Sequence, residues 1–242
     1  MRTVSIGLSH LILAYLILVE PLLGKHYYER LTRTIATDVL ARTRFYRIII
    51  LIEWAWMVVV AAILAGRPDP VRAIGLTAGA MTPVGLGLTT GIFVGLAAST
   101  AVFAVNANLR AWFQKSAAGV SALIPVTTHE RWLFAGVAVT AGICEEILFR
   151  GFLTLYFGEM GLSAALTIVL GAVIFGLAHA YQGWKGVAQT TLMGALFMAL
   201  FVVSGSLVPC IVAHAAIDLR VLVLFRPESP DLTASSASQN EP

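Results

Sequence analysis

Long apolar stretches recur along this sequence and constrain its fold more than any other feature. A helix needs about 20 apolar residues to cross a hydrocarbon layer of ~30 Å. Only 12% of the residues are charged and 58% are hydrophobic, whereas soluble domains carry about a quarter charged residues. The sequence therefore predicts an all-α fold, a polytopic transmembrane helical bundle of about seven spans, within a range of six to eight. The expected spans are residues 4–24, 48–65, a stretch within 74–105, 132–157, 162–180, 186–203 and 207–225.

The chain divides into three parts on this pattern. Residues 1–131 hold the N-terminal spans and two basic polar segments, residues 132–225 form a helical core of closely spaced spans, and the polar tail 226–242 is predicted to be disordered. Apolar residues at helical spacing within 25–47 predict a helix lying at the membrane interface. Glycine at every fourth residue from Gly87 to Gly95 predicts a close contact with another helix.

The basic residues of the loops are distributed unevenly between the two ends of the predicted spans. Because cytoplasmic loops are enriched in Lys and Arg, this asymmetry predicts an outside amino terminus and a cytoplasmic carboxyl terminus. We expect an integral protein of a bacterial inner (cell) membrane that contacts the lipid bilayer and no nucleic acid. One end carries Lys25, Arg30, Arg33, Arg42, Arg44, Arg47, Arg110, Lys115, Arg131, Lys185 and Arg226, and the other Arg2, Arg67 and Arg72.

Ionisable residues inside the apolar stretches indicate function, because burying a charge in a bilayer is costly. Most of them fall in the last four spans. Glu146 and Arg150 are four residues apart on one helix face and are expected to pair. Glu145 points about 100° away from that face and is left as the unpaired carboxylate.

Two further spans contribute histidines. His214 and Asp218 are again four residues apart, so one face presents an imidazole beside a carboxylate, and His179 comes from a third helix. A carboxylate beside a histidine can hold and deprotonate a water molecule. The second histidine with its aspartate can polarise a substrate carbonyl, or the four groups can bind a divalent metal such as zinc. Either arrangement is typical of a hydrolase, although neither HExxH nor GxSxG occurs.

These residues resemble the three motifs of the CAAX protease and bacteriocin-processing (CPBP) family, which includes the type II CAAX prenyl endopeptidases. The matching segments are Glu145-Glu146-x-x-x-Arg150, Phe175-x-x-x-His179 and His214-x-x-x-Asp218. The resemblance implies an intramembrane endopeptidase, acting on a membrane-associated protein or peptide, in which Glu145 and His179 activate water. It also implies that His214 and Asp218 stabilise the oxyanion or complete a metal site.

The same resemblance gives Glu146, Arg150 and Phe175 supporting positions. It departs from this sequence at Asp218, where the eukaryotic CAAX enzymes have Asn. An anionic Asp is a poorer oxyanion donor and a better metal ligand, so the sequence leaves a glutamic and a metal-assisted mechanism open.

Two alternatives come from other functional classes. Buried Glu, His and Asp also occur in secondary transporters and proton relays, although the first half of the chain shows no matching polar set. A catalytically idle immunity or scaffold protein of the same fold is the second, and the intact set of six residues argues against it. Glu20 and Glu53 lie in apolar stretches without an assigned role, and Cys144 is interpreted as apolar helix filler rather than a nucleophile.

Overall fold

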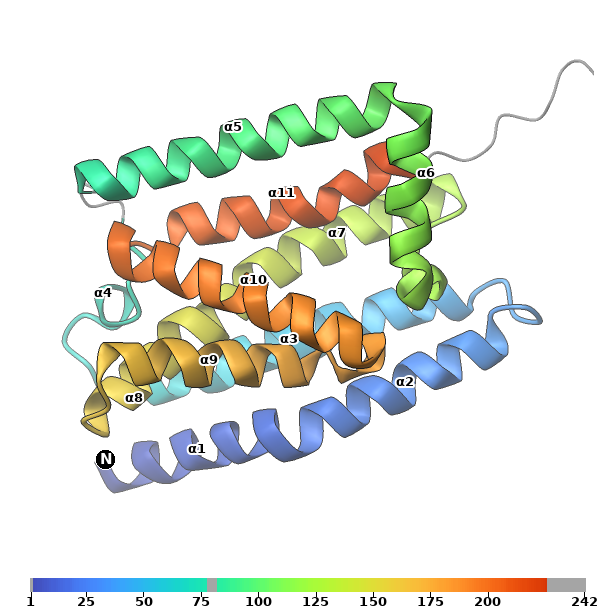
Figure 1. Ribbon diagram of the computed structural model, residues 1–242. Helices are drawn as coiled ribbons and strands as arrows, with labels where there is room; N and C mark the ends of the chain where they lie inside the picture. The colour runs from blue at the N-terminus through green and yellow to red at the C-terminus, as the bar shows by residue number, and fades with distance from the viewer. Residues whose placement is uncertain (1, 78–81, 226–242) are drawn as a thin grey trace, which may run out of the picture.

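The computed structural model describes residues 2–77 and 82–225, and this part of the chain is helical without any strand. The predicted all-α fold is therefore confirmed. The longer helices run side by side, and α6 crosses one end of the bundle (Figure 1). The elements are α1 (Arg2–Ala14), the π-helix η1 (Tyr15–Val19), α2 (Glu20–Thr34), α3 (Ala41–Leu64), α4 (Pro70–Ala73), α5 (Pro83–Val105), α6 (Ala107–Ser116), the 3-10 helix η2 (Ala117–Leu123), α7 (Thr128–Glu145), the π-helix η3 (Glu146–Phe152), α8 (Leu153–Glu159), α9 (Ala164–Ala178), the 3-10 helix η4 (Ala180–Gln182), α10 (Gly183–Ser204) and α11 (Val208–Leu224).

Five helical stretches in the described ranges are long and apolar enough to cross a membrane. They are Ile6–Thr34, Ala41–Leu64, Pro83–Val105, Thr128–Glu159 and Ala180–Ser204. Helix α9 is apolar but shorter, and α11 has 17 residues. These seven helices correspond one by one to the seven predicted spans, with α9 and α11 below the length of a regular span. The chain is an integral membrane protein.

The interfacial helix predicted within residues 25–47 is wrong. The first helix instead continues as α2 to Thr34, and α3 begins at Ala41. Pro21 follows directly after η1, where the Glu20 amide donates to the Tyr15 carbonyl oxygen. Proline lacks an N–H and disrupts regular α-helical hydrogen bonding, and a π-helical turn accommodates this without ending the helix.

Close helix contacts hold the helices that carry the predicted site residues. Helix α9 packs along α10, and α7 packs against both α11 and α3. A Cβ added at Gly142 of α7 would lie 2.9 Å from the Ala215 Cβ of α11, so only glycine permits this approach. Because Gly142 and Ala215 adjoin the motifs of α7 and α11, this contact brings Glu145 and His214 together.

The glycine repeat of α5 does not make the predicted contact. Among the residues that the structure describes, no atom lies within 4 Å of a Cβ built at Gly87, Gly91 or Gly95. Helix α5 uses another face: a Cβ at Gly85 would meet the backbone of Ser204 at the end of α10. A four-residue repeat identifies a flat face, and it does not specify which face the bundle buries.

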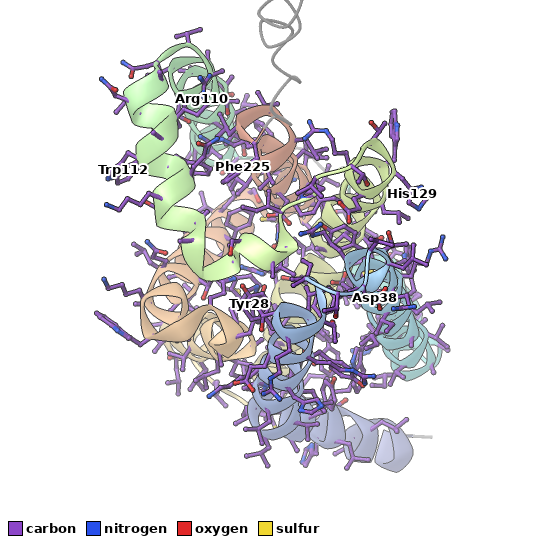
Figure 2. The ribbon with its side chains drawn as sticks, turned by 90° about the vertical axis from the view of Figure 1, so that its right-hand side faces the viewer. Tyr28, Asp38, Arg110, Trp112, His129 and Phe225 are labelled. Carbon is purple, nitrogen blue, oxygen red and sulfur yellow. The ribbon has the colours of Figure 1, made fainter. Side chains whose placement is uncertain are left out.

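A buried ion pair holds together the end of the bundle that carries most of the basic residues. Figure 2 shows this end face on. Arg42 of α3 donates from Nη1 to both carboxylate oxygens of Glu130 of α7, at 2.9 and 3.0 Å. Its Nε also donates to the Ala122 carbonyl oxygen of η2. Glu130 completes a capping box with Thr127 at the start of α7. These contacts hold the segment η2 over this end of the bundle. The tail 226–242, predicted to be disordered, lies outside the described residues.

Candidate active site

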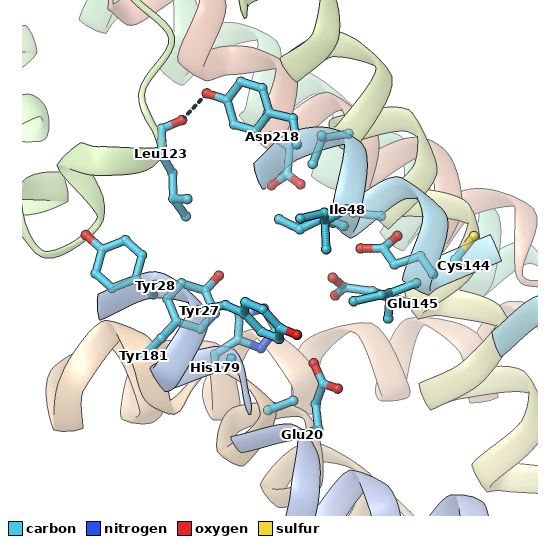
Figure 3. Close-up of a pocket in the computed structure, with 18 of the residues that line it drawn as sticks. Glu20, Tyr27, Tyr28, Ile48, Leu123, Cys144, Glu145, His179, Tyr181 and Asp218 are labelled. Carbon is cyan, nitrogen blue, oxygen red and sulfur yellow. Dashed lines mark hydrogen bonds between the residues drawn. The ribbon is translucent and has the colours of Figure 1, made fainter. Parts of the chain in front are cut away.

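A cavity of about 340 Å³ lies between the N-terminal helices and the helical core, and residues of both line it. All four predicted catalytic residues are among its lining residues: Glu145, His179, His214 and Asp218. Figure 3 shows Glu145 and His179 turned toward the same space from different helices. The phenol of Tyr46 donates to the Leu123 carbonyl oxygen at 2.7 Å and ties α3 to η2 beside the cavity. The structure thus brings the predicted set together.

Glu145 is the last residue of α7 and presents an unsatisfied carboxylate to the cavity. Its Oε2 is buried and has no hydrogen-bond partner, and Nε2 of His214 lies 3.9 Å from it. The helix continues past Glu145 as the π-helix η3, a form that is rare and often found at functional sites. The predicted assignment of Glu145 as the unpaired carboxylate agrees with this geometry.

His214 of α11 lies beside three carboxylates and is hydrogen-bonded to one of them. Its Nδ1 lies 2.7 Å from Oε1 of Glu146, and because a carboxylate only accepts, Nδ1 donates the proton. The other ring nitrogen, Nε2, lies 3.7 Å from Oδ2 of Asp218 and faces Glu145. The hydrogen bond to Glu146 therefore fixes the orientation of the ring and directs Nε2 toward the cavity.

The predicted pair of Glu146 and Arg150 forms, at 3.0 Å between Oε1 and Nη1, and both side chains are almost completely buried. The Arg150 guanidinium also stacks 4.1 Å above the centroid of the Phe175 ring. A cation over an aromatic face is attracted by the ring quadrupole. Arg150 thus balances the charge of Glu146, and Phe175 holds Arg150 in place.

Phe175 also positions the second histidine through its backbone. Helix α9 ends at Ala178, and His179 follows as its C-cap. Nδ1 of His179 donates to the Phe175 carbonyl oxygen at 2.8 Å, because that oxygen only accepts. A neutral His179 then carries its free acceptor on Nε2, which is the state a base or a water-binding group requires.

The same residues adjoin a second, smaller cavity. Its volume is about 150 Å³, and it is lined by Glu146, Arg150 and residues of α9 and α10. His179, His214 and Asp218 line both cavities. The two histidines therefore stand in the wall between a larger cavity toward the N-terminal helices and a smaller one toward α10.

The side chains as they lie do not form the predicted zinc site. No three His, Cys, Asp or Glu side chains within 2–77 and 82–225 are arranged to hold one metal ion. His214 directs one nitrogen to Glu146, and Nε2 is 3.7 and 3.9 Å from the nearest carboxylate oxygens of Asp218 and Glu145. A metal at these residues remains a prediction.

Sequence reasoning missed two carboxylates of this cavity. Glu20 of α2 and Glu53 of α3 both line it, and Glu20 accepts a hydrogen bond from the Tyr15 hydroxyl at 2.5 Å. Each lies alone in an apolar stretch without a partner at helical spacing. The missed signal was their occurrence inside predicted spans, which by itself marks an ionisable residue as functional.

Comparison with known families matches one part of this chain to a family model. Residues 127–220 match the family model described as Rce1-like, type II CAAX prenyl endopeptidase Rce1-like. The predicted resemblance is confirmed. No curated protein and no solved structure matches the chain.

The Rce1-like segment begins at Thr127, the N-cap of α7, and ends at Arg220, two residues after Asp218. It contains all three motifs, the hydrogen bond between His214 and Glu146, and the contact of Arg150 with the Phe175 ring. At the level of the family, the match supports a CAAX-type intramembrane protease and hence a peptidase. The helices that form the opposite wall of the cavity, α2 and α3, lie outside the Rce1-like segment.

Proposed function

We propose that this protein is an intramembrane endopeptidase that cleaves a membrane-associated protein or peptide with a water molecule activated by Glu145 and His179. The observation that carries the proposal is the buried Oε2 of Glu145, which lacks a hydrogen-bond partner and faces a cavity shared with two histidines. A buried carboxylate without a partner is costly, and a water molecule bound for reaction would satisfy it.

In the proposed reaction, a water molecule lies between the Glu145 carboxylate and Nε2 of His179. Glu145 accepts a proton from the water as its oxygen attacks the substrate carbonyl carbon. The bond between that carbon and the leaving nitrogen then breaks, and the proton held by Glu145 passes to the departing amine. General acid–base catalysis of this kind contributes about 10²- to 10⁴-fold to a rate.

The tetrahedral oxyanion needs a hydrogen-bond donor on the opposite side of the carbonyl carbon. Nε2 of His214 fits this role because Glu146 already occupies Nδ1 and the Asp218 carboxylate lies 3.7 Å from Nε2. Two neighbouring carboxylates favour the protonated imidazolium, which donates from both nitrogens. Glu146, Arg150 and Phe175 act through the two histidines as positioning residues.

The experiment compares termini of membrane proteins, by mass spectrometry, in cells that carry the active protein or a variant. Glu145→Gln, His179→Ala and His214→Ala should each remove the new termini while the variant remains in the membrane. Glu159→Gln is the matched control, because Glu159 lies in the same helical stretch and pairs with Arg67 far from the cavity. Near-normal cleavage by Glu145→Gln would refute the proposed mechanism.

A proton or cation relay is the second candidate, and one observation favours it. Glu20 and Glu53 come from the first half of the chain and line the same cavity as Glu145, so the argument from the sequence against a transporter no longer holds. Proton flux into proteoliposomes separates the two candidates. Flux that depends on Glu53, without any change in protein termini, would favour the relay.

A further inference from the structure

Besides Asp218 of α11, three carboxylates from three other helices line the larger cavity: Glu20 of α2, Glu53 of α3 and Glu145 of α7. Oε2 of Glu53 and Oε2 of Glu145 are both buried without a hydrogen-bond partner. The proposed reaction uses Glu145 and assigns no role to Glu20 or Glu53. The carboxyl groups of Glu20, Glu145 and Asp218 act electrostatically on Glu53, so four acidic side chains gather in this cavity.

No Lys or Arg is among the described residues that line this cavity. Two of the basic residues at the nearby end of the bundle have carboxylate partners elsewhere: Arg42 pairs with Glu130, and Arg33 pairs with Glu29. The chain therefore supplies carboxylates here in excess of cations. A bound molecule that carries a positive charge would supply the missing partner.

The lining around the carboxylates is suited to an organic cation. The side chains of Tyr15, Tyr27 and Trp56 line the cavity together with Glu20 and Glu53. Tyr15 and Trp56 also contact each other, with ring centroids 4.4 Å apart. Aromatic faces attract ammonium and guanidinium groups, most strongly where water is excluded. In Figure 3, Glu20 and Glu145 point toward the same space from different helices.

The π-helical geometry supports a site built from both parts of the chain. The two π-helices of the described residues, η1 and η3, adjoin Glu20 and Glu145 respectively. Each of these carboxylates stands where the regular helix is interrupted. Such interruptions are energetically unfavourable in a plain helix and occur frequently at functional sites.

We propose that Glu20 and Glu53, with the aromatic side chains beside them, form a specificity site that binds a Lys or Arg side chain of the substrate next to the bond that Glu145 cleaves. The inference rests on the proposed function and deepens it by naming the chemistry of the substrate. A cavity of about 340 Å³ is at the lower end of the range for ligand sites, about 300 to 1,000 Å³. It suits one such side chain with the adjoining backbone.

The test measures binding, so that it does not depend on turnover. Full-length protein carrying His179→Ala, which keeps all three carboxylates, is placed in phosphatidylcholine nanodiscs and exposed to a randomised library of short peptides. Retained peptides are sequenced, and empty discs of the same lipid provide the background. We expect Lys and Arg to be enriched about tenfold over norleucine at one position, equivalent to about 1.4 kcal/mol.

The enrichment should disappear when Glu20→Gln and Glu53→Gln are added, and it should persist with Glu29→Gln. Glu29 is the matched control because it lies on α2 like Glu20, pairs with Arg33 at the surface and does not line the cavity. Thermal unfolding of each variant shows that the fold is retained. The selection is repeated with Glu145→Gln in place of His179→Ala, so that the result does not depend on the folding of the His179 variant.

The outcomes of this test and of the terminus comparison are separate. Retention of no peptide above empty discs, or retention without Lys or Arg enrichment, overturns the specificity site even if Glu145-dependent termini are found. Enrichment that depends on Glu20 and Glu53, without any Glu145-dependent termini, supports a cation-binding cavity and refutes the protease. Enrichment that Glu29→Gln removes as well would also overturn the assignment to the cavity.

Discussion

Nδ1 of His214 lies 2.7 Å from Oε1 of Glu146, and this contact joins α11 to the π-helix that follows Glu145. The same carboxylate oxygen lies 3.0 Å from Nη1 of Arg150. Glu146 thus has two partners, one that balances its charge and one that it orients. His214 lines the cavity in which Glu145 lies, and Arg150 lines the smaller cavity beside it.

This shared carboxylate makes Arg150 a structural residue as well as a neighbour of the site. Arg150→Leu should lower the free energy of unfolding by about 3–5 kcal/mol, because it leaves a buried charge without its partner. Combining it with Glu146→Gln should restore much of the protein yield but not the cleavage, since His214 then loses its charged partner. Membrane yield and thermal midpoints measure the first effect. A double variant that is expressed no better than the single one would contradict the pairing.

Asp218 distinguishes two ways of stabilising an oxyanion. An Asn at this position can donate a hydrogen bond, whereas Ala cannot, and loss of one such donor costs about 10²- to 10³-fold in rate. We expect Asp218→Asn to cleave far better than Asp218→Ala in a single-turnover assay. Equal loss in both variants would show that the negative charge, 3.7 Å from Nε2 of His214, is what the reaction requires.

Access to the cavity should follow the distribution of basic residues. Val120 of η2 lines the cavity, and Val71 of α4 is exposed at the opposite end of the bundle. With Cys144 and Cys210 replaced by Ala, a cysteine at 120 should react with a membrane-impermeant maleimide only from the cytoplasmic side. A cysteine at 71 should react only from outside. The reverse pattern would invert the predicted orientation.

Cys144 provides a test of covalent catalysis. It is buried, adjoins Glu145 and lines the cavity. Cys144→Ala should leave cleavage near that of the wild type and cost about 1 kcal/mol of stability, in the usual range for a single substitution. Loss of cleavage with an unchanged thermal midpoint would restore the thiol as a candidate nucleophile.

Helical spacing predicted the contacts within one helix and left those between helices open. The pairing of Glu146 with Arg150 followed from their separation by four residues, and it forms even though η3 is π-helical. The hydrogen bond from His214 to Glu146 joins residues 68 apart, and no local pattern encodes it. The π-helices themselves also depend on the packing of neighbouring helices, which propensity does not describe.

The opposite wall of the cavity was missed for a related reason. Glu20 and Glu53 each stand alone in an apolar helix, so periodicity assigns them no partner, and only the packed bundle places them beside Glu145. The glycine repeat of α5 led to the opposite error, because it predicted a helix contact that the described residues do not form. Its spacing predicts a face suited to close packing, but the free energy of burial elsewhere decides which face the bundle uses.

The cavity has one wall inside the Rce1-like segment and the other in α2 and α3. The proposed catalytic residues and the proposed specificity site thus lie in different stretches of the sequence. An exchange of the region before residue 127 between two such proteins should transfer target preference while leaving the reaction itself in place. Substitutions in the first two long helices could then change which substrate is preferred, while the proposed catalytic residues stay the same.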